Sequence, residues 1–290
     1  MKFSTRFEGS DKYLLLLLTF VFALVALVLH FTSGGNALLV LLVLAVPTVL
    51  AAQIGLYRGT LWRFDVLSRE MNLIRSGIEG QYREYRRIES LFSLFGVLKV
   101  TSPLPSMRDW AISPDFGNLI VDTVHERRPK LALEFGSGVS TLVAGYALRE
   151  AGGGMLISLE HDRDFAEATI RNLKKHGLGD LVRVVHAPLR QVQMRGRDHL
   201  WYDTAALEDM KEIEFVIVDG PPGDLQELAR YPALPLIWSH LRDDAVILID
   251  DANRADERKM AELWCSEFPS LEAERIPTEA GAVIFLRSRG

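Results

Sequence analysis

The residues most able to do chemistry surround a glycine turn near the middle of this 290-residue chain. The apolar residues 131–133 lead into Glu134, which is followed by Gly136, Gly138 and a helix-like segment. A strand, a tight glycine turn and the N-terminus of a helix, in that order, form a pocket for a nucleotide-like ligand. The sequence therefore predicts a cofactor pocket at this turn.

Polar side chains also end the other strand-like runs in this half of the chain. They are Glu160, His186, Asp219, Asp250 and Asp251. The carboxyl ends of parallel strands meet at one edge of a sheet, where open α/β folds bind their ligands. We therefore expect these side chains to share one site with the glycine turn.

Short continuous apolar runs alternate with helix-like segments from about residue 106 onward. The predicted strands are 131–135, 155–160, 182–186, 214–219 and 245–250, with helices at 140–151, 163–176, 225–241 and 256–267. Two last strands, 272–276 and 282–287, are joined by a turn at 277–281. This order predicts an α/β fold with a seven-stranded sheet, parallel except for one strand of the C-terminal hairpin.

The first residues of the chain have a different character. Residues 13–31 and 37–56 are two apolar runs without Asp, Glu, Lys or Arg. At about 1.5 Å per helical residue, each could cross a hydrocarbon core of about 30 Å. Two buried helices of a water-soluble core are the alternative, but such helices normally carry a polar face. We expect a transmembrane helical hairpin over residues 1–57.

Basic residues flank this hairpin on one side of the predicted membrane. Lys2, Arg6 and Lys12 precede the first run, and Arg58 and Arg63 follow the second. Cationic residues favour the cytoplasmic side. The chain is therefore expected to be an integral membrane protein, in a bacterial inner membrane, with both termini and the C-terminal domain in the cytoplasm.

Residues 58–104 are expected to form a juxtamembrane amphipathic helical linker. Its apolar stripe consists of Leu67, Met71, Ile74, Ile78, Tyr82, Tyr85, Ile88, Phe92 and Phe95. This spacing predicts one helix, or a pair broken near residues 77–80, that packs on the next domain. Self-association, or contact with glycan-assembly partners, is the alternative use. Residues 101–105 then separate the linker from a domain at 105–290.

Net charge, cysteine content and one position of the glycine turn argue against several classes of ligand and site. The formal net charge of −5 argues against nucleic-acid binding, and the single cysteine, Cys265, excludes an intramolecular disulfide. The chain has Thr141 where a dinucleotide fingerprint requires its third glycine. These features make a nicotinamide cofactor the weaker choice for the pocket.

The pattern Glu134-x-Gly136-x-Gly138 resembles the first motif of class I S-adenosylmethionine-dependent methyltransferases. The resemblance runs from about residue 105 to the C-terminus, through the motifs WAISPD, GSGVST, SLEHD, HAPL, VDGPPG and IDDANR. With these motifs the chain is similar to a bacterial branch of the family that has a GSGVST loop and acts on oxygen. It implies a Rossmann-like methyltransferase sheet. The family's usual third glycine is Ser140 here.

The resemblance implies S-adenosylmethionine as the cofactor and names residues that would hold it. Gly136, Ser137 and Gly138 would contact the methionine portion and Glu160 the ribose, while His161 and Ala187 would contact the adenine. The full predicted cofactor set is Glu134, Gly136, Ser137, Gly138, Ser140, Thr141, Glu160, His161, Ala187 and Asp219.

Asp219, Asp250 and Asp251 are the predicted catalytic residues. They fall where catechol-type O-methyltransferases place the ligands of a divalent cation, which implies a Mg²⁺ site. Two departures weaken that site: Asp251 replaces an asparagine, and no lysine follows Asp219. Without metal, Asp219 would be the general base, with His186 and His240 as alternatives. Asp250 and Asp251 could instead cap the following helix.

These features together predict a membrane-anchored methyltransferase that modifies a hydroxyl of a membrane-associated glycan, a lipid-linked sugar or a lipid. The variable stretch 190–201 is expected to shape acceptor specificity, and residues 203–212 to form a solvated helix. One alternative is a nicotinamide-dependent oxidoreductase or epimerase, although the chain has no Tyr-x-x-x-Lys pair for it. The other is a non-catalytic membrane scaffold with a relic cofactor pocket.

Overall fold

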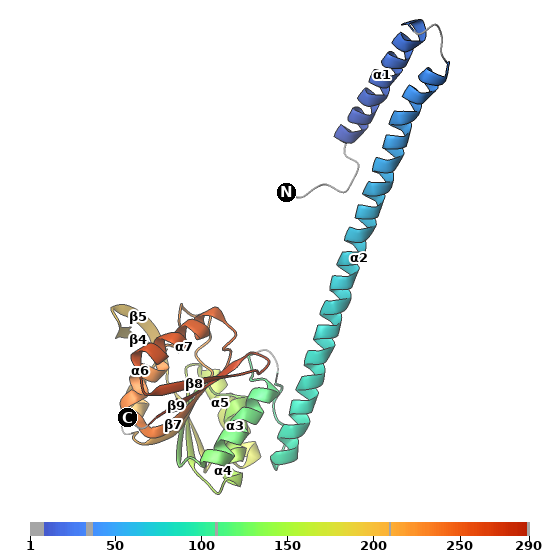
Figure 1. The fold of residues 1–290 in the computed structure, drawn as a ribbon. Coiled ribbons are helices and arrows are strands. Elements are labelled where there is room, and N and C mark those ends of the chain that lie inside the picture. The colour runs from blue at the N-terminus through green and yellow to red at the C-terminus, as the bar shows by residue number, and fades with distance from the viewer. Residues whose placement is uncertain (1–8, 33–36, 108–109, 209, 289–290) are drawn as a thin grey trace. The chain divides into compact units, whose positions relative to one another are not determined.

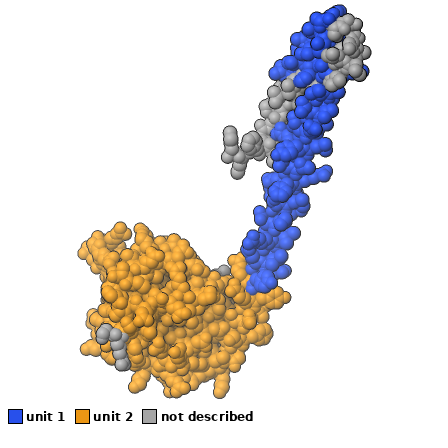
Figure 2. Space-filling model, viewed as in Figure 1, with its two compact units in different colours: residues 1–82 blue, residues 83–290 orange. Residues whose placement is uncertain are grey.

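The computed structural model describes residues 9–32, 37–107, 110–208 and 210–288. The chain divides into two compact units, Met1–Tyr82 and Arg83–Gly290, which Figure 2 shows in blue and orange. The first unit contains α1 (Gly9–Thr32) and most of α2 (Ala37–Val97), whose last turns belong to the second unit (Figure 1). Helix α2 is continuous through Gly77 and Gly80, so no break divides the predicted linker there.

Within the described part of the chain, the structure contains no helix with the length and apolar character to cross a membrane. The predicted spans are only partly covered by that description. Residues 33–36 lie outside the described residues, as do the side chains of residues 9–16, 18, 37–40, 42, 44 and 47. The transmembrane hairpin therefore stays a prediction.

The second unit is built on the predicted seven-stranded sheet. Its strands are β1 (Leu131–Phe135), β2 (Met155–Glu160), β3 (Val182–His186), β6 (Ile213–Val218), β7 (Leu241–Ile249), β8 (Leu271–Ile276) and β9 (Ala282–Arg287). They lie in the order β3-β2-β1-β6-β7-β9-β8, and β9 alone runs in the opposite direction to the other six strands. The predicted α/β class, strand number and C-terminal hairpin are confirmed.

Helices cover both faces of this sheet (Figure 1). Helices α3 (Pro114–Arg127), α4 (Val139–Glu150) and α5 (Arg163–His176) contribute to one apolar core, and α6 (Ala233–Ile237) and α7 (Ala255–Glu267) to the other. Side chains alternate between the faces of a strand. On β6, Phe215 and Ile217 therefore join the first core, while Val216 and Val218 join the second.

The strand ends that the sequence singled out are aligned in the sheet. Phe135 at the end of β1 pairs with Leu159 of β2 and with Val218 of β6, and Val218 also pairs with Ile249 of β7. The residues that follow these strands consequently meet at one edge of the sheet. This alignment assembles the candidate site from segments far apart in the sequence.

The segment before β7 differs from the prediction. A helix was expected over 225–241, but only α6 and a 3₁₀ turn, η2 (Trp238–His240), form there, and β7 already begins at Leu241. Pro232 immediately precedes α6, and a proline disfavours helical backbone at the residue before it. This explains why the helix cannot extend back to residue 225.

A second β-structure lies outside the main sheet, where the sequence predicted only a variable stretch. Strands β4 (Leu189–Met194) and β5 (Arg197–Tyr202) form an antiparallel hairpin. Its two turn residues, Arg195 and Gly196, both have positive φ, as tight hairpin turns require. The predicted helix over 203–212 is reduced to the 3₁₀ turn η1 (Thr204–Leu207), whose Leu207 is buried rather than solvated.

The predicted packing of the linker stripe on the next domain is wrong for its last members. Tyr85, Phe92 and Phe95 are exposed. The contact is made instead by Leu94 and Leu98, which are buried in the core that contains α3 and α4. The end of α2 is therefore anchored through a different face from the one predicted.

Candidate active site

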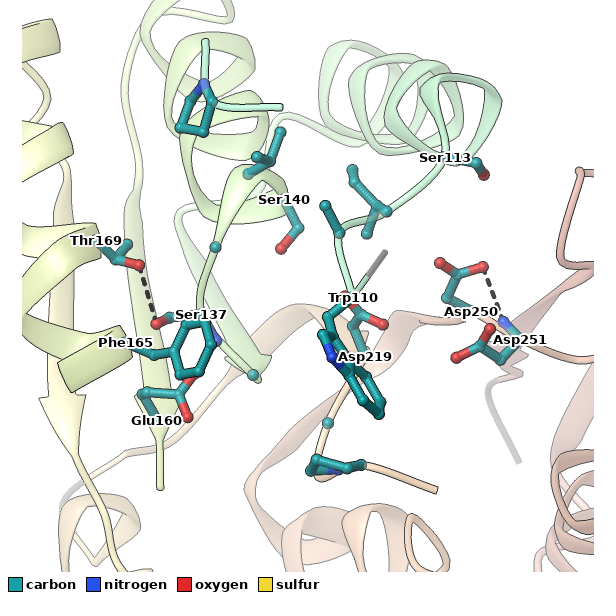
Figure 3. Close-up of a pocket in the computed structure, with 18 of the residues that line it drawn as sticks. Trp110, Ser113, Ser137, Ser140, Glu160, Phe165, Thr169, Asp219, Asp250 and Asp251 are labelled. Carbon is teal, nitrogen blue, oxygen red and sulfur yellow. Dashed lines mark hydrogen bonds between the residues drawn. The ribbon is translucent and has the colours of Figure 1, made fainter. Parts of the chain in front are cut away.

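A cavity of about 730 Å³ opens at the carboxyl ends of β1, β2, β6 and β7, entirely within the second unit. Figure 3 shows Ser137 and Glu160 on one side of it and Asp250 and Asp251 on the other. The predicted residues that line this cavity are Gly136, Ser137, Gly138, Ser140, Glu160, His161, Asp219, Asp250 and Asp251. The fold thus brings together most of the predicted cofactor and catalytic residues.

The glycine turn forms one wall of the cavity. Gly136 has φ +94°, and a Cβ atom there would lie 3.1 Å from the backbone nitrogen of Gly220. Both the positive φ and the close approach require glycine. The turn therefore passes directly over the segment that follows β6, and α4 starts immediately after it.

Two consecutive hydrogen bonds hold this turn from the side that faces the protein core. The Gly138 N–H donates to Thr141 Oγ1 at 2.9 Å, and Thr141 Oγ1 donates to Glu134 Oε2 at 2.6 Å. Glu134 and Thr141 are fully buried and do not line the cavity. Their predicted direct contact with a cofactor is corrected: the structure places them behind the wall, where they hold the loop.

Ala187 also lies behind the cavity wall rather than in it. Its side chain is buried, and its N–H donates to the backbone oxygen of Glu160 at 2.7 Å. The predicted contact of Ala187 with an adenine is therefore not seen in the described cavity. Ala187 instead ties the end of β2 to the segment that follows β3.

Burial raises the pKa of Glu134 to about 7. An ordinary carboxyl ionises near 4.5, so the unfolded chain releases this proton at a lower pH than the folded chain does. Ionisation of the unfolded state then destabilises the fold as pH rises from about 4.5 to about 7. Below that pH window Glu134 is protonated in both the folded and the unfolded state. Above the window the loss of folding stability no longer changes with pH.

We expect the variant Glu134→Gln to remove this pH dependence. Between pH 5 and pH 8 the wild-type free energy of unfolding should fall relative to that of the variant, by up to about 3 kcal/mol. Urea unfolding of both proteins at the two pH values measures this difference. Parallel pH dependences for the two proteins would show that Glu134 ionises normally in the fold.

Glu160 is a carboxylate held in place before any ligand binds. Its Oε2 accepts from the Ser137 N–H at 2.7 Å, and its Oε1 accepts from the Asp162 N–H at 3.0 Å. Burial by itself raises the pKa of Glu160, but the hydrogen bonds from His161, Asp162 and Ser137 outweigh it and lower the pKa. Glu160 is thus an ionised, oriented acceptor beside the glycine turn.

The opposite side of the cavity contains the three predicted catalytic aspartates and a buried arginine. The Nη2 atom of Arg230 lies 3.0 Å from Asp251 Oδ2 and 3.6 Å from Asp219 Oδ1. Arg230 also donates to the backbone oxygens of Pro221, Asp219 and Asp250. Its guanidinium therefore fastens the segment after β6 to the segment after β7.

This arrangement does not fit the predicted Mg²⁺ site. In the part of the chain that the structure describes, no group of three or more His, Cys, Asp or Glu side chains is placed to hold a metal ion. The positive charge between Asp219 and Asp251 belongs to Arg230, and Arg254 Nη1 pairs with Asp251 Oδ2 at 2.9 Å. The aspartates are thus paired with guanidinium groups, which corrects the metal prediction.

The environment keeps two of these aspartates protonated to unusually high pH. Burial raises the pKa of Asp219 to about 7 against the opposing charge of Arg230, and burial with the nearby Asp219 raises that of Asp250 well above its ordinary value. A carboxyl that titrates near neutrality is suited to proton transfer. Asp219 thus has the properties of a general base.

The remaining candidates for these roles are less well placed. His186 is hydrogen-bonded to the backbone oxygen of His161 and His240 to that of Met210, and neither lines the cavity. Helix α7 has Arg254 as its N-cap, so Asp250 and Asp251 do not cap it. Of the predicted general bases, only Asp219 lies in the described cavity.

Several cavity residues were missed by the sequence interpretation, among them Arg230 and Tyr202. Arg230 lies in an irregular segment without periodicity, so no pattern marked it as a partner of the aspartates. Tyr202 ends the unpredicted hairpin, and only the short apolar run at residues 200–202 could have indicated its strand. Trp110, the first residue of the WAISPD motif, also lines the cavity with an exposed indole.

The second unit has the fold of known methyltransferases. One similar structure is a methyltransferase from Podospora anserina bound to S-adenosylhomocysteine: 17% identity, TM-score 0.52, covering 74% of this chain and 96% of that chain. Another is the O-methyltransferase TomG from Streptomyces achromogenes in complex with S-adenosylmethionine: 19% identity, TM-score 0.50, covering 69% and 96%.

The family comparison agrees with this fold. Residues 133–252 match a family model described as a methyltransferase domain, and the match includes the glycine turn, Glu160, Asp219, Asp250 and Asp251. No curated protein matches the chain. Residues 133–252 are therefore a methyltransferase domain, and they supply most of the predicted residues of the cavity.

Proposed function

We propose that this protein transfers a methyl group from S-adenosylmethionine to a hydroxyl oxygen. The observation that carries the proposal is the pairing of the Gly136–Gly138 turn with the oriented carboxylate of Glu160 in one cavity. The two similar structures hold S-adenosylhomocysteine and S-adenosylmethionine, and one of them is an O-methyltransferase. Both observations support the same cofactor.

Some residues around the cavity would bind the cofactor, and others would take part in proton transfer. Glu160 would accept hydrogen bonds from two neighbouring hydroxyls of the ribose, and the glycine turn would lie against the methionine portion. Bound S-adenosylmethionine supplies an electrophilic methyl group on sulfur. Asp219 would take the proton of the acceptor hydroxyl while the C–S bond breaks and the O–CH₃ bond forms. Arg230 would hold the Asp219 carboxylate in place.

Calorimetric titration of the full-length protein with S-adenosylhomocysteine and, separately, with NAD tests this proposal. Binding of S-adenosylhomocysteine with no heat from NAD is the expected result. Binding of NAD alone would favour an oxidoreductase or epimerase. The absence of binding to either ligand would favour a scaffold with a relic pocket.

We also propose that residues 13–56 attach the enzyme to a membrane, so that its acceptor is a membrane-associated glycan, a lipid-linked sugar or a lipid. The proposal is supported by the two uncharged runs and by the exposed apolar side chains of α1, including Leu17, Phe20 and Phe31. The exposed stripe on α2 is the proposed surface for self-association or for glycan-assembly partners.

The attachment predicts that the full-length protein sediments with membranes and resists extraction by alkaline carbonate. A variant that lacks residues 1–57 should remain in the supernatant. Release of the full-length protein by carbonate would exclude an integral membrane anchor, whereas the cofactor proposal would be unaffected.

A further inference from the structure

Tyr202 is a cavity residue for which the proposed function has no role. It is the last residue of β5, in the hairpin outside the seven-stranded sheet. Its ring packs against Phe135, with centroids 5.6 Å apart, and against Trp201 at 5.1 Å. The side chain is 1% exposed, so its position is determined by the packing of the core.

The hydroxyl of Tyr202 is buried without a hydrogen-bond partner among the described residues. A Cβ atom added to Gly220 would lie 2.2 Å from this oxygen and 3.0 Å from the Cα of Gly136. The hydroxyl thus lies at the floor of the cavity, where the glycine turn meets the segment after β6. An unsatisfied buried hydroxyl is unfavourable by about 1–3 kcal/mol, and a ligand with a suitably placed acceptor would remove that penalty.

The surroundings decide whether this hydroxyl donates or accepts. Burial, and after it the negative charge of Glu160, raise the pKa of Tyr202 well above its ordinary value, so the phenol keeps its proton. Its ring also contacts that of His161, with centroids 6.0 Å apart, on the Glu160 side of the cavity. The neutral O–H group at Gly220 is therefore a hydrogen-bond donor that has no acceptor among the described residues.

We propose that Tyr202 Oη donates a hydrogen bond to an oxygen of the bound S-adenosylmethionine, so that the β4–β5 hairpin forms part of the cofactor site. This inference rests on the proposed function. It assigns the hairpin a role in cofactor binding, in addition to the acceptor specificity that the sequence suggested for this stretch. Because the hydroxyl lies at Gly220 and the ring contacts His161, the hydroxyl would lie near the ribose and the sulfur of a cofactor held by Glu160 and the glycine turn.

The variant Tyr202→Phe tests the proposal, because it removes only the oxygen and keeps the ring. We expect the Kd for S-adenosylhomocysteine, measured by calorimetry without any methyl acceptor, to rise about 5- to 10-fold. The melting temperature of the unliganded variant should equal or exceed that of the wild type, because no internal hydrogen bond is lost.

Tyr231→Phe is the matched control. Tyr231 Oη donates to Glu267 Oε2 at 2.7 Å, and Tyr231 does not line the cavity. This variant should melt at a lower temperature without ligand and bind S-adenosylhomocysteine with the wild-type Kd.

Each remaining outcome has one meaning. An unchanged Kd for Tyr202→Phe, with normal binding by the wild type, overturns the role of Tyr202. A lower melting temperature of the unliganded Tyr202→Phe variant also overturns it, because the hydroxyl would then have a partner within the protein. Failure of the wild type itself to bind S-adenosylhomocysteine overturns the proposed function instead.

Discussion

Replacing Glu160 with glutamine should weaken the binding of S-adenosylhomocysteine by about 100-fold or more, through the loss of charge-assisted hydrogen bonds that contribute about 1.5–3 kcal/mol each. In the wild type both carboxylate oxygens accept backbone N–H groups, from Ser137 and from Asp162. The amide of glutamine would turn an N–H donor toward one of these donors. The variant loses both the charge and the orientation with which, in the proposed function, Glu160 binds two ribose hydroxyls.

Glu167→Gln is the matched control for this experiment. Glu167 lies on α5, where it pairs with the exposed Arg163 and does not line the cavity. Calorimetry should give the wild-type Kd for this variant. If Glu160→Gln also binds with the wild-type Kd, Glu160 does not contact the cofactor, and its role is confined to supporting the glycine turn.

Replacing Arg230 with methionine should lower the free energy of unfolding by about 3–5 kcal/mol, since removing one partner from a buried ion pair leaves the other uncompensated. Arg230 is 3% exposed, and its guanidinium bonds to three backbone oxygens as well as to Asp251. Methionine fills a similar volume but supplies neither charge nor donors. Urea unfolding measures the loss.

The pH–rate profile is a second measurement, and it separates the effect of the Arg230 charge from the effect of its packing. The positive charge of Arg230 lowers the pKa of Asp219 against the effect of burial. Without it, that pKa should rise, and the acid side of the pH–rate profile for methyl transfer should move to higher pH. Arg230→Lys keeps the positive charge but not the planar set of donors. Its pH–rate profile should therefore stay close to that of the wild type, while its free energy of unfolding should still be lower.

Arg163→Met provides the control for the stability measurement. Arg163 forms an exposed pair with Glu167 on α5, and such surface pairs contribute about 0–1 kcal/mol. An equal loss of stability in Arg163→Met and Arg230→Met would show that the buried guanidinium is not the connection between the two aspartate segments. An unchanged pH–rate profile in Arg230→Met would remove its effect on Asp219.

Most of the sheet could be predicted because its strands are buried on both faces. Mostly apolar runs such as 131–135 and 213–218, each with a single glutamate, mark such strands directly, and the two strands of the C-terminal hairpin are separated by an evident turn. The prediction failed where proline and irregular backbone replace periodicity, as before α6. It also failed for the β4–β5 hairpin, whose charged residues resemble a loop.

In the candidate site too, the residues fixed by local geometry could be predicted, and those whose contacts are made elsewhere in the fold could not. The glycine turn, Glu160 and Asp219 could be found because local geometry requires particular residue types at strand ends. Glu134 was misplaced because acidic-x-Gly-x-Gly gives no indication of which way the acidic side chain points. In the fold it points beneath the loop and bonds Thr141.

The amino-acid sequence by itself determined the α/β class, the position of the cofactor turn and the carboxylates at the strand ends, because each depends on neighbouring residues. Only the tertiary structure decided that a guanidinium lies between Asp219 and Asp251, and that the hydroxyl of Tyr202 reaches Gly220. These contacts join segments without a shared local pattern. They depend on how the chain packs around the sheet, which no spacing along the sequence records.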